Sequence, residues 1–371
     1  MTYSSPPAAD EFELSLFGPG KGECIVLHLG DGQWIVVDSC RNPATHVPVA
    51  SEYLDALGVD IARDVRQFII THWHDDHIGG AHEFFERATG AEFVCSGALG
   101  NEEFVTLLRC GRRSLFTNTS SGVDEFRYIL ESLDERPGSR RIAGRGPTLA
   151  RSDQRLSQLT HTSGSTSEEW ALSPANATLT LAVRAFGDLV PDAGEYRNRL
   201  PTQTANELSV VLWVRVGAVT ALLGGDLEQS NDPARGWTAI VSSSRRPQGR
   251  ASVFKVPHHG SRDADCPDVW NALLEPSTTS LLTPFGCGRL PLPTPSDVSR
   301  LKARSSSLIC TAPPGGTASI RRTRAVDRTI RETARSFRTI EGGTGQIRIR
   351  AKHGETSANL RVELFAGAVL L

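Results

Sequence analysis

The sequence lacks an apolar run of the roughly 18 residues that a membrane-spanning helix needs. The nearest run, residues 210–225, contains Arg215 in its middle and predicts two strands. Residues 1–10 contain neither a basic start nor an apolar stretch, so they do not resemble a secretion signal. We therefore expect a soluble, cytoplasmic protein with no membrane partner.

Paired cysteines are also missing. The seven cysteines are odd in number and form no CxxC motif, so we expect neither a disulfide framework nor a cysteine-rich zinc site. Aromatic residues make up only 6% of the chain, which argues against an extended surface for stacking nucleic-acid bases. The chain of 371 residues is nevertheless long enough to bury a large core.

Lysine is scarce, with four residues against 36 arginines, and the charges are unevenly spread. Residues 1–60 carry nine acidic and two basic side chains, whereas residues 300–350 carry three acidic and twelve basic ones. Such asymmetry is typical of a surface that faces a polyanion. A genome rich in arginine codons is the alternative explanation, although it does not account for the clustering.

A predicted helix at residues 326–340 gathers part of this positive charge. Its apolar residues recur every three to four positions, and a stripe of arginines runs beside them. Guanidinium groups match the geometry of phosphates. Three arginines are therefore candidate substrate-binding residues, with a solvated helix face as the alternative: Arg328, Arg331 and Arg335.

Strand and helix patterns alternate in two parts of the chain, which predicts a layered α/β fold. In the first part, we expect strands at residues 24–29, 34–37, 67–71 and 92–95, with helices at 53–57 and 81–88. In the second part, we expect strands at 178–186, 208–216, 219–223 and 253–256, with helices at 267–274 and 295–304. Residues 100–175 read as an insertion with helices at 102–109 and 123–133 and a mobile loop rich in Arg, Gly and Ser.

The residues best suited to binding a metal ion lie directly after a predicted buried strand, at positions 71–80, Thr-His-Trp-His-Asp-Asp-His-Ile-Gly-Gly. In an extended chain His72 and His74 point the same way, so both can reach one metal ion. A turn through the next residue would aim Asp76 and His77 at a second ion. Imidazole and carboxylate ligands suit zinc, iron or manganese. Burying these polar groups without a partner would be costly, so the motif predicts a metal site.

Three further strand ends carry residues that can bind a metal. Asp38 follows the strand at 34–37, Asp226 follows an apolar strand and two glycines, and the pair His258-His259 follows the strand at 253–256. The carboxyl ends of strands in open α/β sheets are where such proteins place ligands. An ordinary turn explains a single strand-Gly-Asp segment equally well. The turn after the histidine pair makes Ser261 a candidate contact for an anion.

These motifs, in this order, resemble the metallo-β-lactamase fold, whose HxHxDH signature fits residues 72–77. Within that superfamily the chain looks most like the C-terminal hydrolase domain of ComEC-type competence proteins and their free-standing relatives. The stretches that carry this likeness are residues 17–24, 206–212, 223–226 and 255–261. The resemblance implies one domain, an αββα four-layer sandwich with its core at about 12–98 and 178–315. The insertion at 100–175 interrupts it, and a basic helix and closing strands follow at 316–371.

The resemblance and the residues together imply a two-metal hydrolase. One ion would be bound by His72 and His74, the other by Asp76, His77 and one of His258 and His259, with Asp226 shared between them. Zinc is the metal we expect, with manganese and iron as alternatives. The side chains expected to take part in catalysis, by holding a ligand or moving a proton, are Asp38, Asp76, His258 and His259. His161 is a further candidate ligand.

Three functions stay open at this point. A phosphodiesterase or nuclease fits the ComEC-type likeness and the basic C-terminal region, and its substrate could be a nucleic acid. A carbon-ester hydrolase, acting on a lactone, thioester or β-lactam, would use the same metal centre. A component of a multi-protein system, active only with a protein partner, is the third possibility.

Overall fold

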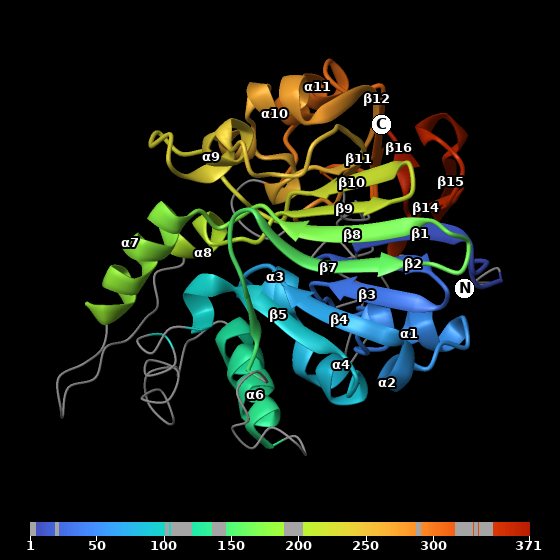
Figure 1. Ribbon diagram of the computed structural model, residues 1–371, viewed down its shortest axis with the longest axis horizontal. Helices are drawn as coiled ribbons and strands as arrows, with labels where there is room; N and C mark the ends of the chain where they lie inside the picture. Colours follow the sequence, from blue (N-terminus) through green and yellow to red (C-terminus); the bar gives the residue numbers. More distant parts are fainter. Residues whose placement is uncertain are drawn as a thin grey trace.

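The protein is described by a computed structural model, which covers residues 5–18, 22–100, 104, 121–135, 146–188, 203–286, 291–315, 329, 333 and 344–371. Two large sheets lie against each other, and helices cover their outer faces (Figure 1). No helix within these residues is long and apolar enough to cross a membrane. The predicted helices at 102–109 and 326–340, the latter with Arg328, Arg331 and Arg335, lie outside the described residues apart from single positions.

The first sheet has eight strands in the order β15-β14-β1-β2-β3-β4-β5-β6. Neighbouring strands are antiparallel from β15 to β3 and parallel from β3 to β6. The strands are β1 (Glu11–Gly18), β2 (Cys24–Gly30), β3 (Gln33–Val37), β4 (Val65–Ile70), β5 (Glu92–Ser96), β6 (Thr148–Ala150), β14 (Gly345–Lys352) and β15 (Arg361–Phe365).

The second sheet also has eight strands, in the order β16-β13-β12-β11-β10-β9-β8-β7. The four strands from β13 to β10 are parallel, and antiparallel strands flank them on both sides. The strands are β7 (Gln154–Thr160), β8 (Thr166–Ala171), β9 (Leu212–Val216), β10 (Val219–Leu223), β11 (Ala251–Lys255), β12 (Leu274–Leu282), β13 (Ser307–Cys310) and β16 (Val369–Leu370).

Helices cover the outer face of each sheet (Figure 1). The first sheet is covered by α1 (Val49–Ala56), α2 (Ile61–Asp64), α4 (Ala81–Arg87) and α6 (Ser121–Glu135). The second is covered by α9 (Gly236–Ser242), α10 (Pro267–Ala272) and α11 (Pro295–Lys302). Three hydrophobic clusters fill the spaces between these layers. The prediction of an αββα sandwich is therefore confirmed.

The central strands are apolar on both faces because both faces are covered. Along β4, Phe68 and Ile70 face the helix layer, whereas Ile69 between them faces the other sheet. Along β11, Val253 faces the space between the sheets and Phe254 faces the outer helices. Side chains alternate between the two faces of a strand, so a parallel strand in a four-layer sandwich reads as a nearly continuous apolar run.

The strand predicted at residues 178–186 is wrong, because the structure has helix α7 (Asn176–Gly187) there. The alternation of Thr178-Leu179-Thr180-Leu181 suggested a period of two. The buried positions, however, are Thr178, Ala182 and Phe186, which are four apart and share one face of a helix. Phe186 packs in the helix layer against Trp73 and Phe104.

The segment predicted as an insertion, residues 100–175, also differs from expectation. Helix α6 lies where a helix was predicted at 123–133. After residue 147, however, the chain forms β6 at the edge of the first sheet and β7 and β8 at the edge of the second. The predicted loop there was based on Arg, Gly and Ser content, but β8 buries alternate residues, among them Ser167 and Glu169, as a strand with one covered face does.

Glu169 on β8 gives a test of this buried edge. Its side chain is fully buried, and burial raises its pKa from an ordinary 4.5 to about 8. Between these pH values the folded chain keeps a proton that the unfolded chain has released, so the free energy of unfolding falls as pH rises. Glu169→Gln removes this loss. We expect the variant to gain stability over the natural chain from pH 5 to pH 8, on the order of 4 kcal/mol.

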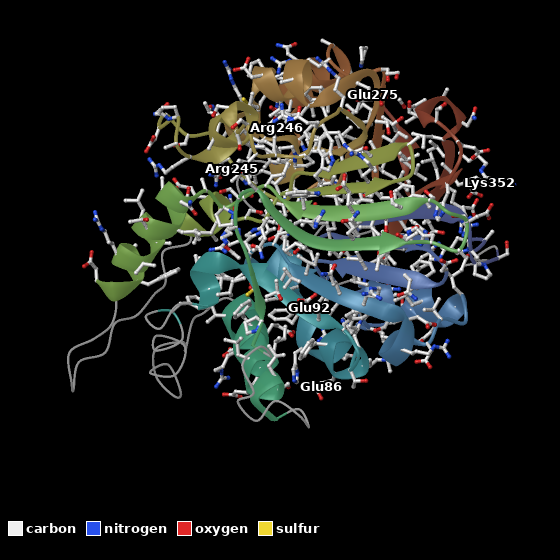
Figure 2. The ribbon with its side chains drawn as sticks, viewed as in Figure 1. Glu86, Glu92, Arg245, Arg246, Glu275 and Lys352 are labelled. Atoms are coloured by element: carbon white, nitrogen blue, oxygen red, sulfur yellow. The ribbon has the colours of Figure 1, made fainter. Side chains whose placement is uncertain are left out.

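Denaturant unfolding at several pH values measures this difference. Glu275→Gln is the matched control, because Glu275 lies on the outside of the second sheet (Figure 2). A gain for Glu169→Gln that stays constant across this pH range would contradict the prediction.

Candidate metal centre

The predicted site residues gather where the carboxyl ends of parallel strands from both sheets meet. Asp38 follows β3, and the histidine motif at 72–77 follows β4, including the short helix α3 (Asp75–Ile78). From the second sheet, Asp226 lies three residues after β10, and the pair at 258–259 lies three residues after β11. The sandwich thus brings together segments that are up to about 220 positions apart in the sequence, from Asp38 to His259.

One group of possible metal ligands consists of Asp76, His77, Asp226 and His259, whose ligand atoms all lie within 4.8 Å of one another. His259 Nε2 lies 2.9 Å from Asp76 Oδ2, and His77 Nε2 lies 3.3 Å from Asp226 Oδ1. His77, Asp226 and His259 are buried, and Asp76 is half-buried.

A second group consists of His72, His74 and Asp226. His72 Nε2 lies 3.2 Å from His74 Nδ1 and 3.9 Å from Asp226 Oδ2. Asp226 belongs to both groups, and its Oδ2 also lies 3.8 Å from His259 Nε2 of the first group. That Asp226 is shared by two ions stays a prediction.

The residues present fit a bound cation. Two buried atoms, His77 Nε2 and Asp226 Oδ1, have no hydrogen-bond partner among the described residues, although they face each other. Buried polar atoms without a partner are rare and need an explanation. Imidazole nitrogen and carboxylate oxygen are the donors that zinc and related divalent metals bind. A cation between these atoms would satisfy both.

The carboxylates also set the electrostatics of the site. Burial by itself would lower the pKa of His77, but Asp226, Asp76 and Glu23 outweigh it and raise that pKa well above its ordinary value. The pKa of His259 is raised in the same way against burial, by Asp226 and Asp76. Side chains that stabilise a positive charge on imidazole also stabilise a metal cation in the same place.

Asp38 orients one ligand of each group. It accepts a hydrogen bond from His77 Nδ1 at 2.7 Å, which directs Nε2 of that ring into the site. It also accepts from the backbone and hydroxyl groups of Thr71, and that hydroxyl lies 3.0 Å from His72 Nδ1. Carboxylates that hold metal-binding histidines in this way fix the tautomer and the ring orientation.

The adjacent histidines 258 and 259 are placed differently. His259 stacks on Phe285, and its Nδ1 lies 3.1 Å from the carbonyl oxygen of Thr283, so its Nε2 faces Asp76. His258 lies in neither ligand group. Its Nδ1 is 3.2 Å from Glu228 Oε1, and its side chain is 21% exposed. Both residues have positive φ, 47° and 51°, and this unusual turn separates the two rings.

Asp75, within the histidine motif, accepts a hydrogen bond from the backbone of Gly122 and so fastens the start of α6 to the motif. Two other candidates, Ser261 and His161, have different surroundings. The Ser261 side chain accepts a hydrogen bond from the backbone of Asp263, as in an ordinary turn. His161 lies 3.5 Å from Asp31, which precedes β3, whereas Asp38 follows it. His161 is therefore at the opposite end of the sandwich from the metal centre.

Two charged residues beside the site, Lys255 and Glu23, were not predicted from the sequence. Lys255, the last residue of β11, is fully buried, and its Nζ lies 2.5 Å from Glu23 Oε1. Burial alone would lower the pKa of Lys255, but Glu23 and Asp226 raise it, so the ammonium stays charged. A lone lysine inside the apolar run Val-Phe-Lys-Val was the signal that could have revealed the pair.

Comparison with known proteins assigns part of the chain. Residues 17–107 match the family model described as the metallo-β-lactamase superfamily. No curated protein sequence matches the chain.

Three solved structures are similar to it at low identity. A HARLDQ-motif mutant of a metallo-β-lactamase from Cronobacter sakazakii is 15% identical, over 65% of this chain and 75% of that one, with a TM-score of 0.31. The metallo-β-lactamase fold protein YhfI from Bacillus subtilis is 10% identical, over 65% and 70%, with a TM-score of 0.32. The subclass B3 enzyme MEM-A1 from a soil metagenome library is 13% identical, over 69% and 82%, with a TM-score of 0.32.

The family match includes β2 to β5 and the complete histidine motif. The second sheet, which supplies Asp226 and His259, completes the sandwich outside the matched residues. Residues 17–107 are therefore similar to the metallo-β-lactamase superfamily, and the described residues form the αββα sandwich.

Proposed function

We propose that this protein is a hydrolase that uses two divalent metal ions, zinc in the first instance, to cleave phosphodiesters. The observation that carries the proposal is the position of Asp226, which belongs to two groups of nitrogen and oxygen ligands: its Oδ1 lies 3.3 Å from His77 Nε2, and its Oδ2 lies 3.9 Å from His72 Nε2. Two ions placed about one shared carboxylate form the clamp that many phosphoryl-transfer enzymes use.

In this proposal the ions supply Lewis acidity and a water molecule of lowered pKa. The chain's own residues hold the ligands and move a proton. Asp38 fixes the ring of His77 directly and that of His72 through the hydroxyl of Thr71. His258 lies at the partly exposed side of the site, between Glu228 and Asn206, where it can donate a proton to the leaving oxygen.

The choice of a phosphodiester rests on two features of the sequence. The segments at 206–212 and 255–261 resemble the ComEC-type hydrolases, and the bases at 300–350 would attract a polyanion. Asn206 and His258 add hydrogen-bonding groups that suit phosphate oxygens better than an apolar ester. A lactone or thioester remains the competing outcome of the test below.

The test compares the natural chain with Asp226→Asn on single- and double-stranded DNA, RNA and a chromogenic phosphodiester. Zinc and manganese are supplied separately, and a lactone and a thioester are assayed in parallel. We expect metal-dependent cleavage of a phosphodiester that the variant lacks. Cleavage of the lactone or thioester alone would overturn the substrate class. No cleavage of any substrate by a protein that holds two metals would point to a missing partner.

The arginine stripe gives a separate prediction about polymer substrates. Changing Arg328, Arg331 and Arg335 to Glu together is expected to raise KM for a polynucleotide at least about tenfold, because phosphate contacts depend on positive charge. The salt dependence of binding should weaken by about one unit of slope for each lost contact. The KM of the small chromogenic diester should not change, and an equal rise for both substrates would remove the stripe from substrate binding.

A further inference from the structure

Lys255 is a buried cation directly behind the candidate metal centre. It ends β11, which lies inside the second sheet between β10 and β12, and none of its side chain is exposed. A buried ammonium is costly unless it is paired and hydrogen-bonded. Lys255 is the only one of the lysines at described positions to be buried, because Lys302 and Lys352 are on the surface.

The partners of Lys255 account for its charge. Its Nζ lies 2.5 Å from Glu23 Oε1, donates to the carbonyl oxygen of Gly225 at 2.9 Å, and lies 3.8 Å from Asp226 Oδ1. The ammonium therefore contacts the shared carboxylate and the backbone that carries it. Glu23, just before β2, brings the counter-charge from the other sheet.

Glu23 extends the same network to a second ligand. Its Oε2 accepts a hydrogen bond from the hydroxyl of Thr283 at 2.6 Å. The carbonyl and hydroxyl oxygens of Thr283 lie 3.1 and 3.2 Å from His259 Nδ1. One chain of contacts thus runs from Lys255 through Glu23 and Thr283 to His259, on the side of that ring away from the site.

The main chain at Asp226 is fixed by its own contacts, whereas the orientation of the Asp226 side chain depends on Lys255. Gly225 has a φ of 51°, and Ser209 accepts the hydrogen bond of the Asp226 amide at 3.0 Å, which fixes the main chain. Among the residues that the structure describes, no hydrogen bond holds Asp226 Oδ1. Lys255 is the cation nearest to that oxygen apart from the histidines of the ligand groups. Its position favours the carboxylate orientation in which Oδ1 lies beside His77 and Oδ2 lies between His72 and His259.

We propose that Lys255 and Glu23 form a buried positioning pair that holds Asp226 and His259 in the orientation needed to bind two metal ions. The inference rests on the metal centre of the proposed function. Loss of Lys255 alone would strengthen metal binding through charge, and loss of Glu23 alone would weaken it, because a fixed cation repels a metal ion and a fixed anion attracts it. If the pair positions the ligands, removing both members weakens metal binding although the net charge beside the site stays the same.

The double variant Glu23→Gln/Lys255→Met separates these two effects, because it removes the pair and leaves the total charge of the cluster unchanged. The probes are Zn²⁺ and Co²⁺ alone, measured by competition with a chelator and by the visible absorption of bound Co²⁺. Lys352→Met is the matched control, because Lys352 lies on the surface at the end of β14 (Figure 2). Circular dichroism checks that each variant is folded.

We expect the double variant to bind at least one of the two ions about 10- to 100-fold more weakly, as for other residues that orient metal ligands. Its Co²⁺ spectrum should also change, because the spectrum reports the geometry of the ligands, and Lys352→Met should match the natural chain. A double variant that binds both ions with the natural affinity and spectrum overturns the positioning role and leaves the metal centre standing. A natural chain that binds neither probe overturns the metal centre and this inference with it.

If the double variant does not fold, the variant Glu23→Asp tests the proposal in its place. It keeps both charges and shortens the carboxylate by one methylene group, which pulls it away from Lys255 or from Thr283. A positioning role predicts weaker metal binding and a changed Co²⁺ spectrum in this variant. Natural binding and an unchanged spectrum would overturn that role.

Discussion

Asp226→Asn is expected to abolish hydrolysis and to remove at least one bound metal ion while the chain stays folded. Asp226 is the residue shared by the group of Asp76, His77 and His259 and the group of His72 and His74. Asparagine has the same shape and keeps the backbone contact to Ser209, but it removes the negative charge between the two groups. Metal ions contribute several kcal/mol of transition-state stabilisation, so we expect kcat to fall by about 10³-fold or more.

Metal content by mass spectrometry and turnover of a chromogenic diester check this expectation together. Asp268→Asn is the control, because that carboxylate is exposed in the first turn of α10. His74→Ala should also abolish turnover. His74 belongs to the second group, so its loss should prevent that group from binding its metal ion. Turnover retained in either Asp226→Asn or His74→Ala would contradict a two-metal centre.

The sequence predicted much of this site because its residues follow strands that are easy to recognise. An apolar run such as Phe68-Ile69-Ile70 must be covered on both faces, and the polar motif after it must lie at an edge of the sheet. The same reasoning placed Asp38, Asp226 and the histidine pair at strand ends. The structure shows that these ends meet, which follows from packing two sheets whose parallel strands end on the same side.

The parts that the sequence did not predict depend on contacts across the fold. Glu23 and Lys255 are 232 positions apart, and neither belongs to a local pattern that names its partner. Helix α7 was predicted as a strand because alternating Thr and Leu satisfy a period of two, whereas its docking against the helix layer selects a period near four. In the first case only the tertiary contact defines the pair, and in the second the tertiary contact outweighs a local preference.

The sequence also did not predict which of the two adjacent histidines, His258 or His259, belongs to a ligand group. Two adjacent histidines in an extended strand would point to opposite faces, and the sequence could not decide which one faces the metals. The structure has both residues in the left-handed region. The contact of His259 with Thr283, and that of His258 with Glu228, make the difference.

This difference leads to the second prediction, which compares His259→Ala with His258→Ala. His259→Ala is expected to weaken metal binding at least about 100-fold, since a residue that contacts the ion should matter more than one that orients a ligand. His258→Ala should keep the natural metal content, because His258 belongs to neither ligand group. Both variants should lose turnover on a natural diester, for different reasons.

The leaving group distinguishes loss of a proton donor from loss of a metal. An alkoxide leaving group needs a proton, so His258→Ala should slow cleavage of a dinucleotide by about 10²- to 10⁴-fold. A nitrophenolate leaves without one, so the same variant should cleave a nitrophenyl diester at close to the natural rate. His259→Ala should slow both substrates alike, because both need the metals. If His258→Ala slows the two substrates equally, or loses metal, His258 does not donate the proton and belongs with the ligands instead.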